Sequence, residues 1–117
     1  MKQKEIMIVE DNPDIRDLIG FILTEDAYQL KMCPTAISFQ DEIAKKLPDV
    51  IVMDIMLPDG DGTDLCRVVK NNPATQHIPV LLMSAHKSEL KTETGANSFI
   101  PKPFNIIDFK QIVESYL

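Results

Sequence analysis

The sequence has no long apolar run, and none of its hydrophobic stretches approaches the roughly 20 residues that a membrane-spanning helix needs. It also has no apolar signal segment, because the charged start at residues 1–5 leads directly into a strand-like stretch. No internal repeat, linker or low-complexity segment interrupts the chain. These absences argue against a membrane protein and predict a soluble protein of the cytoplasm.

Basic clusters and paired cysteines are also missing. The net charge is -6 and no group of Lys and Arg stands out, which argues against direct nucleic-acid binding, since such binding usually needs a basic face. Cys33 and Cys66 form no CxxC pair, and neither stands beside a histidine at metal-binding spacing. We therefore interpret both as buried free thiols in a reducing compartment.

Apolar residues, in contrast, are plentiful enough for one core. The chain has 117 residues, 44% hydrophobic and 26% charged, so we expect a single globular domain over residues 1–117. Short apolar runs at residues 5–10, 29–33, 49–54, 79–84 and 97–100 are predicted to be strands. Continuous apolar strands are typical of parallel sheets with helices on both faces. The βαβ alternation therefore predicts an α/β fold with a doubly wound parallel sheet, whose ligands bind at the carboxyl ends of the strands.

Helical periodicity predicts the segments between these strands. Asn12 can cap the first helix, with Pro13 in its first position. The segment from His86 to Thr94 has one large apolar residue, so we expect this fourth helix to be shortened or irregular. The predicted apolar stripes of the other helices are Ile15, Leu18, Ile19, Ile22 and Leu23; Ala36, Phe39 and Ile43; Leu65, Val68 and Val69; and Ile106, Phe109, Ile112, Val113 and Tyr116.

Acidic residues follow two of the strands at the edge where ligands are expected. Glu10 and Asp11 follow the first run, and Asp54 ends the third. Unpaired carboxylates raise one another's pKa, and a cation such as Mg²⁺, which prefers hard oxygen ligands, relieves this repulsion. Lys102 and Ser84 add an ammonium and a hydroxyl at the ends of two further strands. With a cation present, one carboxylate can attack a phosphoryl donor and become an acyl phosphate.

These motifs resemble the receiver domain of response regulators, the module that histidine kinases phosphorylate in two-component signalling. The resemblance covers essentially the whole chain. It is carried by Glu10-Asp11, by Asp54 with Leu57-Pro58 and Asp61-Gly62, by Ser84-Ala85, Gly95-Ala96 and Phe99, and by Lys102-Pro103-Phe104. With this resemblance we expect a flavodoxin-like five-stranded sheet in the order 2-1-3-4-5.

The resemblance implies a role for each residue of the acidic edge. Asp54 is expected to be the phosphoacceptor. Asp11, Asp54 and the backbone carbonyl of Met56 are expected to bind Mg²⁺, with Glu10 acting through water. Because an aspartyl phosphohydrolase needs an acid two residues after its nucleophile, Met56 argues against rapid turnover.

Residues of the last two strands have implied roles as well. Ser84 is expected to bond a phosphoryl oxygen on activation, and Phe99 to be an aromatic switch coupled to Ser84. Lys102 is expected to pair with the phosphoryl group, and its bond to Pro103 to be cis. Pro101 replaces the small or polar residue usual in this family, and its missing N–H is tolerable on an edge strand.

The function that follows is phosphorylation-dependent signalling. A histidine kinase or histidine phosphotransfer protein is the expected donor, and a downstream effector protein or domain the expected recipient of the signal. A homodimer that forms on phosphorylation is compatible with the family. The domain is expected to assist its own phosphotransfer and slow dephosphorylation without being a turnover enzyme.

One alternative is a phosphorylation-independent interaction module on the same fold, which the polar segment at 86–94 mildly favours. The chain ends with its last helix, so we expect it either to act alone by binding a partner or to be one domain of a longer chain.

Overall fold

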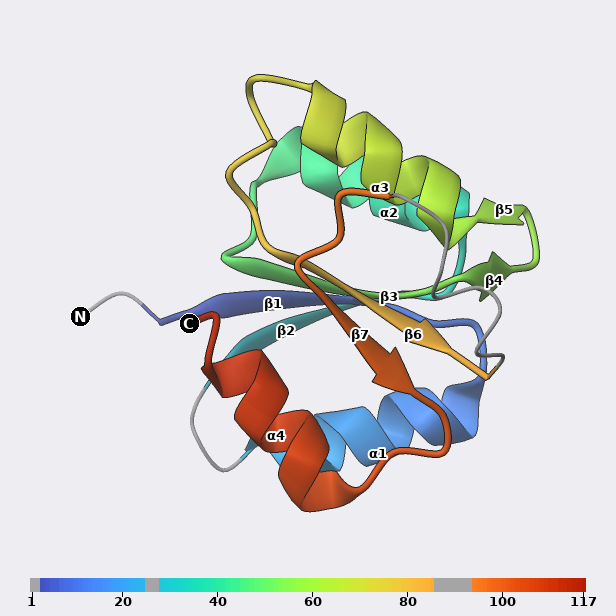
Figure 1. Ribbon diagram of the computed structural model, residues 1–117, viewed down its shortest axis with the longest axis vertical. Coiled ribbons are helices and arrows are strands. Elements are labelled where there is room, and N and C mark those ends of the chain that lie inside the picture. The colour runs from blue at the N-terminus through green and yellow to red at the C-terminus, as the bar shows by residue number, and fades with distance from the viewer. Residues whose placement is uncertain (1–2, 25–27, 86–93) are drawn as a thin grey trace.

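The structure, a computed structural model, describes residues 3–24, 28–85 and 94–117. Its centre is a five-stranded parallel sheet (Figure 1). Across the sheet the strands are β2 (Gln29–Cys33), β1 (Glu5–Val9), β3 (Val50–Asp54), β6 (Val80–Ser84) and β7 (Ser98–Pro101). Counted within this sheet alone, the order is the predicted 2-1-3-4-5, and each observed boundary lies within one residue of its prediction.

Helices cover both faces of the sheet, as Figure 1 shows. On one face lie α2 (Ala36–Lys45) and α3 (Gly62–Asn71), and on the other lie α1 (Pro13–Thr24) and α4 (Ile106–Glu114). Among the residues that the structure describes, no helix is long and apolar enough to cross a membrane. The doubly wound architecture is therefore confirmed for the described part of the chain.

The sheet separates two apolar clusters. Successive side chains of a strand point to opposite faces, so the continuous apolar strands supply both clusters. The cluster under α2 and α3 includes Met7, Val9, Ile51, Met53, Leu82, Phe39, Leu65, Cys66 and Val69. The cluster over α1 and α4 includes Ile6, Ile8, Val52, Leu81, Met83, Ile19, Leu23, Phe109 and Val113.

The predicted start of α1 is confirmed. The Oδ1 of Asn12 accepts hydrogen bonds from the backbone N–H groups of Asp14, at 2.9 Å, and Ile15, at 3.2 Å. Pro13 is the first helical residue, where its missing N–H costs no intrahelical hydrogen bond. The capping sequence therefore fixes where the chain turns from β1 into α1.

Three residues of the predicted stripes are exposed, so their predicted burial was wrong. Val68 is 65% exposed because the buried side of α3 is formed by Leu65, Cys66 and Val69. Ile106, the first residue of α4, and Leu18 of α1 are also exposed. Regular spacing predicted which helices are amphipathic, but the predicted buried faces were wider than the observed ones.

The segment after β3 forms a small second sheet that the sequence did not predict. Strand β4 (Met56–Leu57) pairs antiparallel with β5 (Gly60–Asp61) and projects beyond the end of β3 (Figure 1). The expected shortening of the fourth helix concerns residues 86–94, of which only Thr94 is among the described residues.

The end of β7 agrees with the sequence prediction. β7 is an edge strand and contains Pro101, and the Lys102-Pro103 peptide bond is cis. The backbone N–H of Lys102 donates to the carbonyl of Ser84 at 2.8 Å, which fixes the start of the next loop against β6. The side chain of Lys102 thereby starts from the carboxyl end of the sheet.

Candidate functional site

Three carboxylates meet at the carboxyl end of the sheet. β1 and β3 are parallel, with Val9 level with Met53, so Glu10 and Asp54 follow at the same height. Asp11 is the next residue after Glu10, and carboxylate oxygens of Glu10, Asp11 and Asp54 lie within 4.8 Å of one another. Glu10 is 1% exposed and Asp54 7% exposed, whereas Asp11 is open to solvent.

Lys102 places a cation against the two buried carboxylates. Its Nζ lies 2.6 Å from Oε1 of Glu10 and 3.0 Å from Oδ2 of Asp54. Burial lowers the pKa of Lys102, but the hydrogen bonds to Glu10 and Asp54 and the charges of these carboxylates together outweigh burial, so the pKa is raised and the ammonium stays charged. Burial raises the pKa of Glu10, and the hydrogen bond from Lys102 opposes that shift. One ammonium against three carboxylates leaves an excess of negative charge.

Close backbone packing holds the chain after Asp54. The N–H of Ile55 donates to the carbonyl of Met83 at 3.0 Å, and the N–H of Gly62 donates to the carbonyl of Ile55 at 2.7 Å. A Cβ atom on Gly62 would lie 2.3 Å from the backbone oxygen of Asp54, so no side chain fits at this position. The N–H of Met56 points to Oδ1 of Asp54 at 3.3 Å. The close approach at Gly62 explains the need for glycine in the Asp61-Gly62 motif.

Arg16 supports the first acidic pair and was not identified from the sequence. Its Nη1 donates to the backbone carbonyls of Glu10, at 2.8 Å, and Asp11, at 2.9 Å. The N–H of Glu10 donates to the carbonyl of Cys33 at 3.0 Å, and its Oε2 accepts from the N–H of Asn12 at 3.1 Å. A basic residue in the first turn after an acidic pair is the signal that could have suggested such a contact.

Ser84 and Phe99 lie on one face of the sheet, near its carboxyl end. Asp54 is level with Met83, so Ser84 lies one residue beyond it at the end of β6, where it is buried. Phe99 of β7 is level with Leu82 and packs against the cluster under α2 and α3. Residues 82 and 84 share a face, so Phe99 and Ser84 are diagonal neighbours. Their coupling as a switch stays a prediction.

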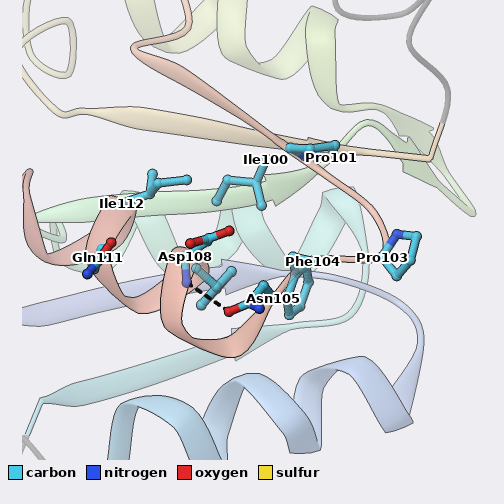
Figure 2. Close-up of a pocket in the computed structure, with 9 residues that line it drawn as sticks. Ile100, Pro101, Pro103, Phe104, Asn105, Asp108, Gln111 and Ile112 are labelled. Carbon is cyan, nitrogen blue, oxygen red and sulfur yellow. Dashed lines mark hydrogen bonds between the residues drawn. The ribbon is translucent and has the colours of Figure 1, made fainter.

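Two hollows lie near Lys102. One, of about 290 Å³, is lined by Ile15, Leu18, Ala85, Lys102, Pro103 and Phe104 and borders the acidic cluster through Lys102. The other, of about 430 Å³, lies between the end of β7 and α4, and Figure 2 shows its lining. Glu10 and Asp54 are buried, so solvent reaches the acidic cluster from the side of Asp11.

The donor set at this edge fits a hard divalent cation. All three carboxylates offer oxygen ligands within one small volume, and the exposure of Asp11 leaves room for water. Mg²⁺ typically binds to one or two carboxylates while it keeps several waters. The residues present therefore match the chemistry of Mg²⁺ better than that of soft metals, which prefer sulfur ligands.

Comparison with known proteins agrees with this geometry. A model of the response regulator receiver domain matches residues 6–114. The phosphate regulon transcriptional regulatory protein PhoB of Klebsiella pneumoniae is 32% identical over 87% of this chain, which corresponds to 46% of PhoB. The chain thus spans about half the length of that relative.

Solved structures share the fold. A putative response regulator from Chloroflexus aurantiacus superposes with a TM-score of 0.91 at 27% identity, and the match covers 98% of both chains. The receiver domain of a Pseudomonas aeruginosa sensor histidine kinase, which carries a magnesium ion in its active site cleft, has a TM-score of 0.89 at 24% identity over 98% of each chain. With the family match over residues 6–114, the chain belongs to the response regulator receiver domains of two-component systems.

Proposed function

We propose that the protein is a signalling receiver in which Asp54 accepts a phosphoryl group from the phosphohistidine of a kinase or phosphotransfer protein. The observation that carries the proposal is the position of the Lys102 Nζ, 3.0 Å from Oδ2 of Asp54 and within the acidic cluster. A carboxylate edge alone repels a phosphoryl group, and a fixed ammonium beside the nucleophile offsets this repulsion.

In the proposed transfer, a carboxylate oxygen of Asp54 bonds to phosphorus while the bond from phosphorus to the histidine nitrogen breaks. The electron pair of that bond stays on the imidazole, and the product is an aspartyl phosphate. Lys102 would pair with one phosphoryl oxygen, and Ser84, buried at the end of β6, would donate its hydroxyl to another. Phe99, a neighbour of Ser84, would then change its side-chain rotamer and so alter the surface that a partner binds.

Asp11, Asp54 and the backbone carbonyl of Met56 would hold Mg²⁺, with Glu10 acting through water. The bound ion would offset the negative charge of the phosphoryl oxygens. The excess of carboxylates over ammonium groups supports this assignment, as does the ion in the Pseudomonas aeruginosa receiver domain.

A donor protein has to bring its phosphohistidine to Asp54 from the solvent-facing side of the cluster, where Asp11 is exposed. The hollow beside Lys102 offers such a protein apolar contacts with Ile15, Leu18 and Phe104. The effector that reads the signal, the homodimer and the cytoplasmic location stay predictions.

Slow loss of the phosphoryl group is part of the proposal. Met56 occupies the position where an aspartyl phosphohydrolase has its acid, and its thioether can neither donate nor accept a proton at neutral pH. The protein would therefore hold the phosphoryl group long enough to signal.

Intact mass after incubation with acetyl phosphate and Mg²⁺ tests the proposal. We expect one added phosphoryl group on the wild type and on Asp41→Asn, a control at an exposed carboxylate of α2. We expect none on Asp54→Asn. An unmodified wild type, or equal uptake by Asp54→Asn, would contradict the proposal.

A further inference from the structure

The hairpin of β4 and β5 connects Asp54 to α3. Met56 pairs with Asp61 and Leu57 pairs with Gly60, so each strand contributes two residues. A hairpin this short has little stability of its own in water. Its position relative to Asp54 therefore depends on contacts that it makes with the rest of the protein.

Asp59, in the turn of this hairpin, makes such a contact with α2. Its Oδ1 accepts a hydrogen bond from the backbone N–H of Ala36 at 2.7 Å, and its Oδ2 accepts one from the N–H of Ile37 at 3.0 Å. These donors lie 23 and 22 residues earlier in the sequence. Both oxygens of one carboxylate thus bind the first turn of another element, which fixes direction as well as distance.

The first turn of α2 already has a cap of its own. Thr35 and Ser38 form a reciprocal capping box, in which Oγ1 of Thr35 accepts from the N–H of Ser38 at 3.0 Å. That box leaves the N–H groups of Ala36 and Ile37 without a partner inside the helix. Asp59 supplies both missing acceptors from outside, so the start of α2 and the hairpin after Asp54 are joined.

Two further observations show that this contact is tight and charged. A Cβ on Gly60 would lie 3.1 Å from the Cβ of Ala36, so the turn packs directly on the helix. The hydrogen bonds from Ala36 and Ile37 lower the pKa of Asp59, so its carboxylate is ionised at neutral pH. Ionised acceptors make stronger hydrogen bonds than neutral ones.

We infer that Asp59 is a positioning residue for the divalent cation, because its bonds to α2 anchor the hairpin that carries Met56. The inference rests on the proposed function, since that proposal includes the Met56 carbonyl among the ligands. Met56 is 63% exposed, and within the described part of the chain β5 is the one strand that pairs with β4. Without Asp59 the hairpin would lose its side-chain anchor on α2, and the Met56 carbonyl would be held less firmly.

The affinity for Mg²⁺, measured by titration calorimetry without any phosphodonor, tests this inference. Loss of an outer contact that orients a ligand typically weakens metal binding by 10–100-fold. We expect Asp59→Ala to raise the Kd about tenfold, and Asp59→Asn, which keeps one acceptor oxygen, to raise it less.

Thr35→Ala is the matched control, because it removes a cap from the same helix turn without touching the hairpin. We expect it to lower the Tm by about 4 °C, much as Asp59→Ala does, and to leave the Kd for Mg²⁺ unchanged. If general destabilisation of α2 were the cause, the Kd for Mg²⁺ would rise in both Asp59→Ala and Thr35→Ala. A positioning role of Asp59 predicts a rise in Asp59→Ala alone.

Three outcomes would overturn the inference. One is a Kd for Asp59→Ala within twofold of the wild type, and another is an equal weakening in Thr35→Ala. If Asp59→Ala does not fold, Asp59→Asn decides by the same twofold limit. The third outcome is a wild type that binds no Mg²⁺ and takes up no phosphoryl group. That result would contradict the proposed function as well as the inference. Wild-type binding that Asp54→Asn abolishes but Asp59→Ala leaves intact would sink only the inference.

Discussion

The Nζ of Lys102 lies 3.0 Å from Oδ2 of Asp54, although 48 residues separate them along the chain. Lys102 follows β7 and Asp54 ends β3, with β6 between the two strands. The lysine therefore reaches across a whole strand to its partner. The order of the strands, more than any local motif, brings ammonium and carboxylate together.

Lys102→Ala is expected to destabilise the protein. It leaves the buried carboxylates of Glu10 and Asp54 without their cation, so we expect the free energy of unfolding to fall by roughly 2–4 kcal/mol in urea titrations. Saturating Mg²⁺ should recover part of the loss. Lys46→Ala, which removes a more exposed ion pair with Glu5, should cost less than about 1 kcal/mol. If the two variants lose equal free energy of unfolding, Lys102 does not stabilise the buried carboxylates of Glu10 and Asp54 more than a surface ion pair would.

Gly62→Ala is expected to damage both folding and phosphoryl uptake. Its new Cβ would lie 2.3 Å from the backbone oxygen of Asp54, and the backbone must move to accommodate it, at a cost of about 1–3 kcal/mol. Gly20→Ala is the control, because among the described residues its Cβ would meet the flexible end of Met32 at 3.5 Å, an ordinary contact within a helix. We expect thermal unfolding to show a gain of roughly 0.5–1 kcal/mol for the control. A normal Tm for Gly62→Ala would refute the close approach.

Mg²⁺ is expected to raise the Tm of the wild type, and EDTA to reverse the rise. A ligand at 100 times its Kd stabilises the folded state by about 2.7 kcal/mol. Asp11 is exposed, so Asp11→Asn should leave the metal-free Tm within about 2 °C of the wild type while removing most of the rise with Mg²⁺. A full rise in Asp11→Asn would exclude Asp11 as a ligand.

Cys33 is expected to make stability depend on pH in the alkaline range. Burial, assisted by the charge of Glu42, raises the pKa of its thiol from 9.0 to about 11. Since the folded state keeps the proton longer than the unfolded state, this contribution is complete below about pH 9 and disappears as the pH rises towards 11. It amounts to roughly 2–3 kcal/mol.

Urea unfolding of wild type and Cys33→Ala at several pH values measures this contribution apart from other alkaline titrations. The stability difference between the two proteins should shrink by that amount between about pH 8 and pH 11. A constant difference would mean that the thiol titrates alike in both states. The native thiol should also react slowly with disulfide reagents near neutral pH, because the thiolate is the reactive form.

The strands and the acidic edge could be predicted because they depend on local patterns and one general rule. Runs such as 50–53 are short, continuously apolar and followed by turn residues, which is typical of strands covered on both sides. Parallel pairing then places the residues after each run at one edge, which is how Glu10, Asp54 and Lys102 could be grouped in advance.

Contacts that end on backbone atoms could not be predicted in this way. Arg16 binds backbone carbonyl groups, and Asp59 binds backbone N–H groups. Because almost every residue has these groups, the type of a residue does not indicate that it is the partner. The exposure of Val68 was missed for a related reason. Periodicity gives the direction of the apolar face of a helix, but the width of that face depends on what packs against it.

Pro101 has a consequence for the behaviour of the protein at high concentration. Neighbouring residues of a strand present their backbone groups to opposite sides, and the N–H of Lys102 faces β6, so the nitrogen of Pro101 faces the open edge. An edge position that lacks a donor is a poorer template for another strand. The proline thus disfavours the pairing of another strand with the end of this edge.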